Sequence, residues 1–202
     1  MLLFRPVGML ELERIYEADM QAFPPRLVEQ PIFYPVLNYG YAAQIARDWN
    51  TKSRSFAGYV TQFEVEDSYI SKFQSQNVGA REHEELWIPA EELLEFNAHI
   101  VGRIIVTGAY FGPNFEGYIP KLGGFRGRKA AEQFLILSGS EPLDLSLEIR
   151  TNNLAVFLNY PFWLQHDFAE FGITTEVKEK TLGKVQQIWE QHYPEITLLG
   201  LK

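Results

Sequence analysis

The sequence contains no cysteine, so disulfide bonds, thiolate metal sites and a cysteine nucleophile are all excluded. It also lacks any apolar run approaching the roughly 20 residues that a membrane-spanning helix needs. Residues 1–6 are apolar for too short a stretch to be a signal peptide, and no basic segment precedes them. We therefore expect a cytoplasmic protein without a membrane partner.

Histidine is scarce, and the four histidines stand apart from one another: His83, His99, His166 and His192. Neither an HExxH motif nor a zinc-finger spacing is present, so we expect no metal site. A GxSxG nucleophile elbow is missing too, and Ser138-Gly139-Ser140 is typical of a turn that ends a helix.

Positive charge is in deficit, because 18 Lys and Arg face 26 Asp and Glu and give a net charge of −8. Long-range repulsion of phosphate argues against a nucleic-acid partner. A local basic stretch, Gly123 to Lys129, precedes a predicted helix and would suit a phosphate. It matches neither a Walker A loop nor GxGxxG, so a solvated loop is the alternative interpretation.

The remaining composition is that of a globular protein, with 46% hydrophobic, 14% aromatic and 22% charged residues in 202. Hydrophobic periodicity predicts a mixed α+β fold. The predicted strands are residues 2–5 (ended by Pro6), 32–36, 56–66, 85–89 and 100–111. The predicted helices are residues 9–20, 41–49, 90–96, 129–137 and 176–193. Residues 143–150 and 154–160 are predicted to form a β-hairpin, because Asn152 and Asn153 tolerate the positive φ of a turn.

Two segments could carry chemistry. The acidic residues of 81–85 stand just before the strand 86–89, where a carboxylate could accept a sugar hydroxyl and stabilise oxocarbenium-like charge. Residues 23–26 and 30–35 are dense in proline and aromatics, and such a rigid loop can present an aromatic face to a ring. A solvated charged turn and a lid packed on the core are the respective alternatives.

Several strings, together with the order of the elements, resemble the ADP-ribosyltransferase-like superfamily, and in it a small bacterial family labelled ADP-ribosylation/crystallin. These strings are LFRPVG (3–8), AFPPR (22–26), PIFYPVLN (31–38), YAAQIARDWN (41–50) and WIPAEEL (87–93). The resemblance covers residues 1–111 and implies a split β-sheet core with flanking helices. Residues 112–202 are then a C-terminal extension, with the β-hairpin and a helix, packed on the same domain.

The resemblance also implies a site. It places Arg5 on the first strand as an NAD contact, Phe33 and Tyr34 at the nicotinamide-side aromatic position, and Glu85, or in the alternative Glu84, as the catalytic glutamate. NAD would be the substrate, a small-molecule nucleotide whose ADP-ribose passes to an unidentified acceptor, and no metal is implied.

Pro35 stands where the superfamily usually has Ser or Thr. This departure keeps open a non-catalytic binding module on the same fold. A third alternative is a transferase acting on an RNA end, against which the acidic net charge argues.

Overall fold

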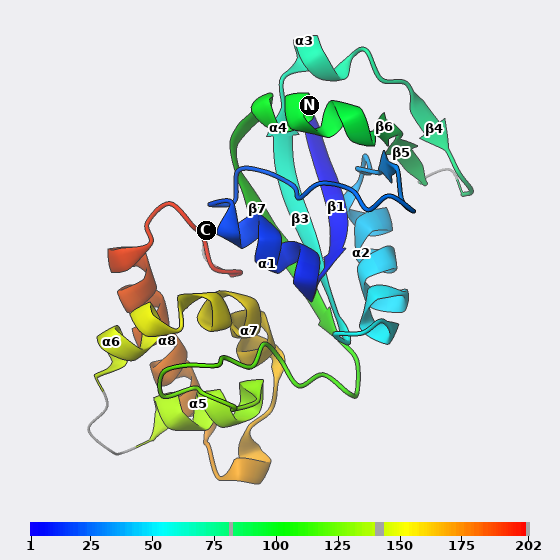
Figure 1. Ribbon diagram of the computed structural model, residues 1–202. Helices are drawn as coiled ribbons and strands as arrows, with labels where there is room; N and C mark the ends of the chain where they lie inside the picture. The colour runs from blue at the N-terminus through cyan, green and yellow to red at the C-terminus, as the bar shows by residue number, and fades with distance from the viewer. Residues whose placement is uncertain (81–82, 140–143, 201–202) are drawn as a thin grey trace. The chain divides into compact units, whose positions relative to one another are not determined.

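The computed structural model describes residues 1–80, 83–139 and 144–200 (Figure 1). The chain divides into two compact units, Met1–Gly112 and Pro113–Lys202. Strands and helices alternate in the first unit, whereas the described part of the second is built of helices, so the protein has a mixed α+β fold. Within these three ranges, the structure contains no helix of the length and hydropathy that crossing a membrane requires.

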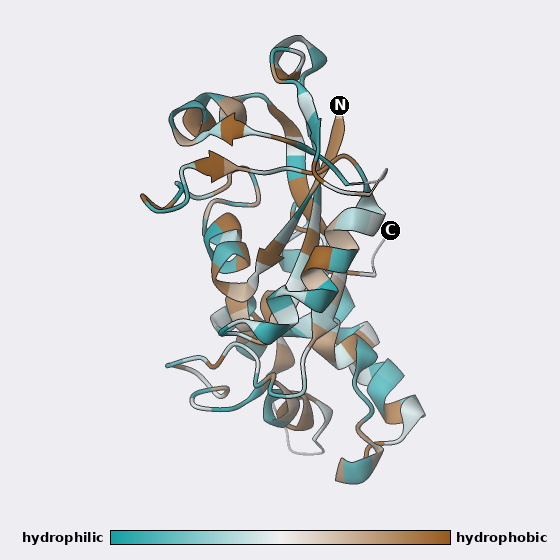
Figure 2. Cartoon of the chain, turned by 90° about the vertical axis from the view of Figure 1, so that its right-hand side faces the viewer, coloured by the Kyte–Doolittle hydropathy of each residue, from teal (hydrophilic) through white to brown (hydrophobic). Residues whose placement is uncertain are grey.

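A three-stranded antiparallel sheet forms the centre of the first unit. Its strands, in the order of the sheet, are β1 (Leu2–Gly8), β3 (Ala57–Val65) and β7 (Ile100–Phe111). Phe63 and Val65 of β3 are buried, so this side of the strand faces the core. Strands and helices alike carry both hydrophobic residues (brown) and hydrophilic residues (teal) (Figure 2).

The prediction that Pro6 ends the first strand is wrong, because β1 continues to Gly8 and pairs Pro6 with Val60. The backbone N–H and C=O of Phe4 bond to Val36, at 2.9 Å and 2.7 Å, on the side of β1 away from β3. Backbone groups alternate in direction along a strand, so the nitrogen of Pro6 also points away from β3. The missing N–H of proline therefore costs the sheet no hydrogen bond to β3.

Beyond β1, short segments extend the strand order. β4 (Ser75–Asn77) pairs with β5 (Glu84–Leu86), and β2 (Ile32–Phe33) pairs with β6 (Ile88–Pro89). Val36 forms one antiparallel bridge to Phe4 and another to Glu85. The segments therefore follow one another in the order β4, β5, the Val36 segment, β1, β3 and β7.

Helices and loops cover both faces of the sheet. α2 (Tyr39–Asp48) packs on one face, where Ala42 and Ala46 meet Phe4 and Val60. The small alanine side chains let the helix approach the sheet closely. The opposite face carries an aromatic cluster, in which the ring of Phe33 lies 4.8 Å from Phe23 and 5.2 Å from Phe96. The other helices of this unit are α1 (Met9–Glu17), η1 (Asn50–Lys52), α3 (Asp67–Ile70), η2 (Ala90–Glu92) and α4 (Leu93–Ala98).

The second unit is helical where a β-hairpin was predicted, so that prediction is wrong. Its elements are α5 (Ala130–Ser138), α6 (Leu145–Thr151), α7 (Asn153–Gln165), η3 (Ala169–Phe171) and α8 (Thr175–His192). Asn152 ends α6 and begins α7, where it had been interpreted as a hairpin turn. A continuous apolar run is compatible with a buried strand or a buried helix. Here α7 is buried on nearly every side, so its sequence shows little helical periodicity.

Three polar side chains inside the second unit, those of Asn159, Gln133 and Trp163, are hydrogen-bonded within it. Asn159 of α7 is fully buried; it accepts the N–H of Tyr118 at 2.8 Å and donates to the side chain of Gln133 at 2.9 Å. The indole of Trp163 donates to the carbonyl of Ala130 at 2.7 Å. These bonds join α5, α7 and the segment before α5 into one core.

Candidate functional site

Glu85 lies on β5, directly opposite Val36. The indole N–H of Trp87 donates to its Oε1 at 2.7 Å. Trp87 stands two residues after Glu85, so the strand alternation places both side chains on one face. Sequence reasoning did not assign Trp87 to the site, although the period of two was a signal that could have found it.

Tyr34 joins the same surface. Its ring meets the ring of Trp87 edge-on, with centroids 6.0 Å apart and an interplanar angle of 89°. Tyr34 is 36% exposed and Trp87 is 48% exposed, so both rings reach solvent. We call Tyr34, Glu85 and Trp87 the edge cluster. It combines two aromatic faces with a carboxylate that is held in place, which is a surface suited to a ring that carries a sugar.

The charge of Glu85 also acts on α2. The pKa of Tyr41 is raised, first by burial and then by the carboxylate of Glu85. The ring of Tyr41 stacks on His83 at a centroid distance of 4.2 Å, and Nε2 of His83 lies 3.2 Å from the side-chain oxygen of Gln44. The carboxylate of Glu85 therefore lies on the side of the strands that α2 covers.

The two candidate glutamates are separated by their positions on β5. Glu84 pairs with Asn77 of β4, and its carbonyl accepts the N–H of Leu37 at 3.0 Å. Neighbouring residues of a strand point to opposite faces. Glu84 therefore faces away from Trp87, and Glu85 is the candidate that lies with Tyr34. Arg81 and Glu82 of the acidic stretch lie outside the described residues.

Arg5 points the other way from the edge cluster. Its guanidinium contacts Tyr34 through the backbone, where Nη1 donates to the carbonyl at 3.2 Å. Nε and Nη2 donate to the two carboxylate oxygens of Glu11 at 2.7 Å and 3.3 Å. The guanidinium also lies 4.5 Å from the centre of the Phe33 ring. Phe33 is fully buried, so the structure places it in the core and Tyr34 at the surface.

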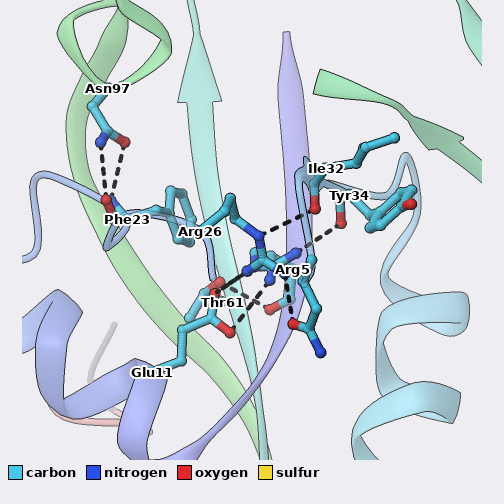
Figure 3. A network of polar contacts seen from close by, with 9 residues as sticks. Arg5, Glu11, Phe23, Arg26, Ile32, Tyr34, Thr61 and Asn97 are labelled. Carbon is cyan, nitrogen blue, oxygen red and sulfur yellow. Dashed lines mark hydrogen bonds and ion pairs between the residues drawn. The ribbon is translucent and has the colours of Figure 1, made fainter. Parts of the chain in front are cut away.

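A second arginine lies beside Arg5, as Figure 3 shows. Nε of Arg26 donates to the carbonyl of Ile32 at 3.1 Å, and Nη2 donates to the side chain of Gln30 at 3.1 Å. Nη1 of Arg26 is 3.9 Å from Oε1 of Glu11. We call Arg5, Arg26 and Glu11 the arginine cluster. Sequence reasoning missed Arg26 as a site residue, because its 21-residue separation from Arg5 forms no local pattern.

The basic stretch before α5 is tied to carboxylates. Nζ of Lys129 lies 2.7 Å from Glu116, and Arg128 lies 3.6 Å from Glu132. The carboxylate of Glu132 also accepts the backbone N–H of Lys129 at 2.8 Å, so it occupies the position at the helix start that an anion would take. Two of the basic side chains that could have bound a phosphate, those of Arg128 and Lys129, are therefore paired with carboxylates of the protein.

Two other kinds of site considered from the sequence were a serine nucleophile and a metal site. The hydroxyl of Ser138 donates to the carbonyl of Leu135 at 3.2 Å, while Ser140 lies outside the described residues. Over residues 1–80, 83–139 and 144–200, the structure shows no group of three or more His, Asp or Glu side chains that could hold a metal ion.

The edge cluster and the arginine cluster thus lie on segments that are neighbours in the strand order. Both clusters contact Tyr34: its ring meets the ring of Trp87, and its backbone carbonyl accepts a hydrogen bond from Arg5. Comparison with family models, curated proteins and solved structures finds no match. The function is therefore argued from the geometry of these two clusters.

Proposed function

We propose that the unit Met1–Gly112 is an NAD-binding, ADP-ribosyltransferase-like module that transfers ADP-ribose to an acceptor. One observation carries this proposal. Glu85 of β5 and Phe4 of β1 each bridge to Val36, so the segments that hold Arg5, Tyr34 and Glu85 are adjacent. This adjacency brings an aromatic ring and a carboxylate together from residues that are 51 positions apart in the chain.

The chemistry would centre on Glu85. When the bond between nicotinamide and ribose breaks, its electron pair leaves with nicotinamide and positive charge develops on the ribose. The carboxylate of Glu85 would accept a ribose hydroxyl and stabilise that charge. A nucleophile of the acceptor would then bond to the anomeric carbon and release its proton to solvent.

The other members of the edge cluster would orient the reactants. The indole of Trp87 fixes one oxygen of Glu85, and the second oxygen would accept the ribose hydroxyl. The ring of Tyr34, edge-on to Trp87, would hold the planar nicotinamide. Holding the reacting groups in one geometry lowers the barrier by avoiding entropy loss during the reaction.

The alternative function is a non-catalytic binding module. Two observations favour it: Glu11 holds the guanidinium of Arg5, and Pro35 stands at the usual Ser or Thr position. In this alternative, the edge cluster binds a planar ligand without cleaving it.

Calorimetric titration of NAD tests whether the ligand binds at the edge cluster. We expect binding by the wild-type chain, and an affinity about tenfold lower in Tyr34→Ala, because an aromatic contact is lost. Trp49→Ala is the matched control, since Trp49 is an exposed aromatic residue at the end of α2. Absence of NAD binding, or an equal loss in the control, would contradict the proposal.

A further inference from the structure

A pocket of about 450 Å³ lies between the end of α1, the loop that follows it, and the segment formed by η2 and α4. Its volume falls within the range of small-molecule sites, which is about 300–1,000 Å³. Most of the residues that line it are apolar, among them Ala18, Phe23, Pro24, Ala90 and Leu93. The lining residues in the described part of the chain include none of the edge cluster, so the pocket is a separate feature of the first unit.

The turn between α1 and the loop has an uncommon backbone conformation. Asp19 and Met20 both have positive φ, 53° and 57°, which few residues other than glycine adopt. Strand β7 holds this turn in place. The N–H of Ile104 donates to the carbonyl of Met20 at 2.7 Å, and the guanidinium of Arg103 donates to the carbonyl of Asp19. The turn is therefore fixed, and it leads residues 21–25 away from α1 and towards α4.

The loop is also fixed to α4. The side chain of Asn97 accepts the N–H of Phe23 at 3.0 Å and donates to its carbonyl at 3.0 Å (Figure 3). Pro24 and Pro25 follow, and the ring of proline restricts φ. A wall that is already ordered loses little conformational entropy when a ligand binds. The pocket is therefore formed before any ligand arrives.

Short side chains keep the pocket open. Ala18, Ala22 and Ala90 are half-buried, and their methyl groups line it. Leu94 lines it too, although this large apolar side chain is 84% exposed to water. An apolar ligand would cover these groups and remove them from water, which is favourable.

Arg14 supplies a positive charge to the lining, and its side chain is 64% exposed. Its Nη1 donates to the carboxylate of Glu17 at 2.7 Å. A guanidinium has five N–H donors, so this bond leaves donors for a second carboxylate. Exposed ion pairs are weak, so Glu17 competes little with a ligand.

We propose that this pocket binds a free small molecule with an apolar body and one carboxylate, such as a medium-chain fatty acid. The apolar body would pack on Ala18, Ala90 and Leu94, and the carboxylate would accept paired N–H groups of Arg14. Walls from three segments enclose a compact volume, which suits a small molecule better than a partner helix.

The inference goes beyond the proposed function and does not depend on it. Phe23 lines the pocket and belongs to the aromatic cluster on one face of the sheet. The carboxylate of Glu85 lies on the opposite side, which α2 covers. A ligand in the pocket would therefore leave the edge cluster accessible.

Calorimetric titration with octanoate and with 1-octanol tests the role of the charge, because the two ligands share a chain and differ in the head group. We expect the wild type to bind both. Arg14→Gln should weaken octanoate binding about tenfold and leave octanol binding unchanged, since only the carboxylate loses a charged partner. Arg47→Gln is the matched control, because Arg47 forms an exposed ion pair with Asp48 at the end of α2.

Two further variants test the apolar part of the pocket. Ala90→Leu fills the pocket with a larger side chain and should abolish binding of both ligands. Leu94→Ser should weaken both about fivefold, because an apolar contact is lost. Its melting temperature should stay nearly unchanged, since Leu94 is largely exposed, so this variant remains informative if Ala90→Leu folds poorly. Leu147→Ser, at an exposed leucine of α6, is the matched control.

Three results would overturn the inference. The first is the absence of octanoate binding by the wild type. The second is a loss of octanoate affinity that is equal in Arg14→Gln and Arg47→Gln, or in Leu94→Ser and Leu147→Ser. The third is self-association of the wild type that Leu94→Ser abolishes in analytical ultracentrifugation, which would show that a second copy of the chain covers the pocket.

Discussion

The indole N–H of Trp87 donates to the carboxylate of Glu85 at 2.7 Å, from a residue two positions along the same strand face. This bond restricts the rotation of a carboxylate that would otherwise move freely at the protein surface. Tyr34 meets the same indole through an edge contact. Trp87 thus connects the aromatic ring and the acid that the proposed chemistry requires.

Replacement of Trp87 by phenylalanine removes the hydrogen bond and keeps an aromatic ring. We expect NAD turnover to fall about fivefold, since a hydrogen bond to a partly exposed carboxylate contributes about 1 kcal/mol. The melting temperature should change little, because Trp87 is 48% exposed. Trp49→Phe should leave turnover unchanged, and an equal loss in both variants would count against the role of Trp87.

Gly58 is predicted to be intolerant of any side chain. A Cβ atom at this position would lie 2.1 Å from the backbone oxygen of Ala46 in α2. We expect Gly58→Ala to destabilise the first unit by about 3 kcal/mol, because the helix must move off the sheet. Gly8→Ala is the control, since Gly8 pairs with Gly58 but a Cβ there meets nothing within 4 Å. Hydrogen exchange of β3 peptides measures the difference, and equal protection would contradict the prediction.

Asn159 tests the core of the second unit. Its side chain makes three hydrogen bonds in a fully buried position, to Tyr118 N–H, to Tyr118 carbonyl and to Gln133. Asn159→Ala should cost about 3 kcal/mol in the free energy of unfolding, because it leaves buried partners unsatisfied. Asn153 is half-buried, and its side-chain hydrogen bond to the carbonyl of Arg150 is exposed to solvent, so Asn153→Ala should cost less than about 1 kcal/mol. Denaturant unfolding, followed by the fluorescence of the buried Trp163, measures the free energy of unfolding of both variants. A similar loss in Asn159→Ala and Asn153→Ala would contradict the prediction.

Alkaline pH should weaken the first unit through Tyr59. Burial raises the pKa of this fully buried phenol well above its ordinary value of 10.0. Above pH 10 the unfolded chain loses the proton while the folded chain keeps it, so stability is intact below pH 10 and falls above it. The loss is at most about 1.4 kcal/mol per pH unit. Tyr59→Phe should flatten this slope in denaturant titrations from pH 8 to 11, and an unchanged slope would exclude Tyr59 as its cause.

The elements of the first unit were predictable where local patterns suffice. The alternation of β3 and the alanine stripe of α2 each specify a buried face without knowledge of the partner. The continuation of β1 through Pro6 was not predictable, because a strand tolerates proline only where the proline nitrogen points away from the neighbouring strand, here β3. The helix α7 was missed because burial on nearly every side removes helical periodicity, and Asn152 and Asn153 fit a turn equally well.

The candidate site shows the same limit. Tyr34 and Glu85 were expected from the resemblance, and Trp87 follows from the strand period once Glu85 is chosen. The pairing of Arg26 with Arg5, and the engagement of both by Glu11, depends on a loop crossing β1, which no short-range pattern encodes.

Release of nicotinamide from NAD by the wild type, Glu85→Gln and Glu84→Gln is the most direct test of the proposed chemistry. Each substitution removes one negative charge, and the two residues are neighbours on β5. Of the two carboxylates, that of Glu85 accepts the hydrogen bond from the indole of Trp87. We predict that Glu85→Gln lowers turnover by about 100-fold or more with an unchanged melting temperature, and that Glu84→Gln retains most of it. Turnover that persists in Glu85→Gln would contradict the account.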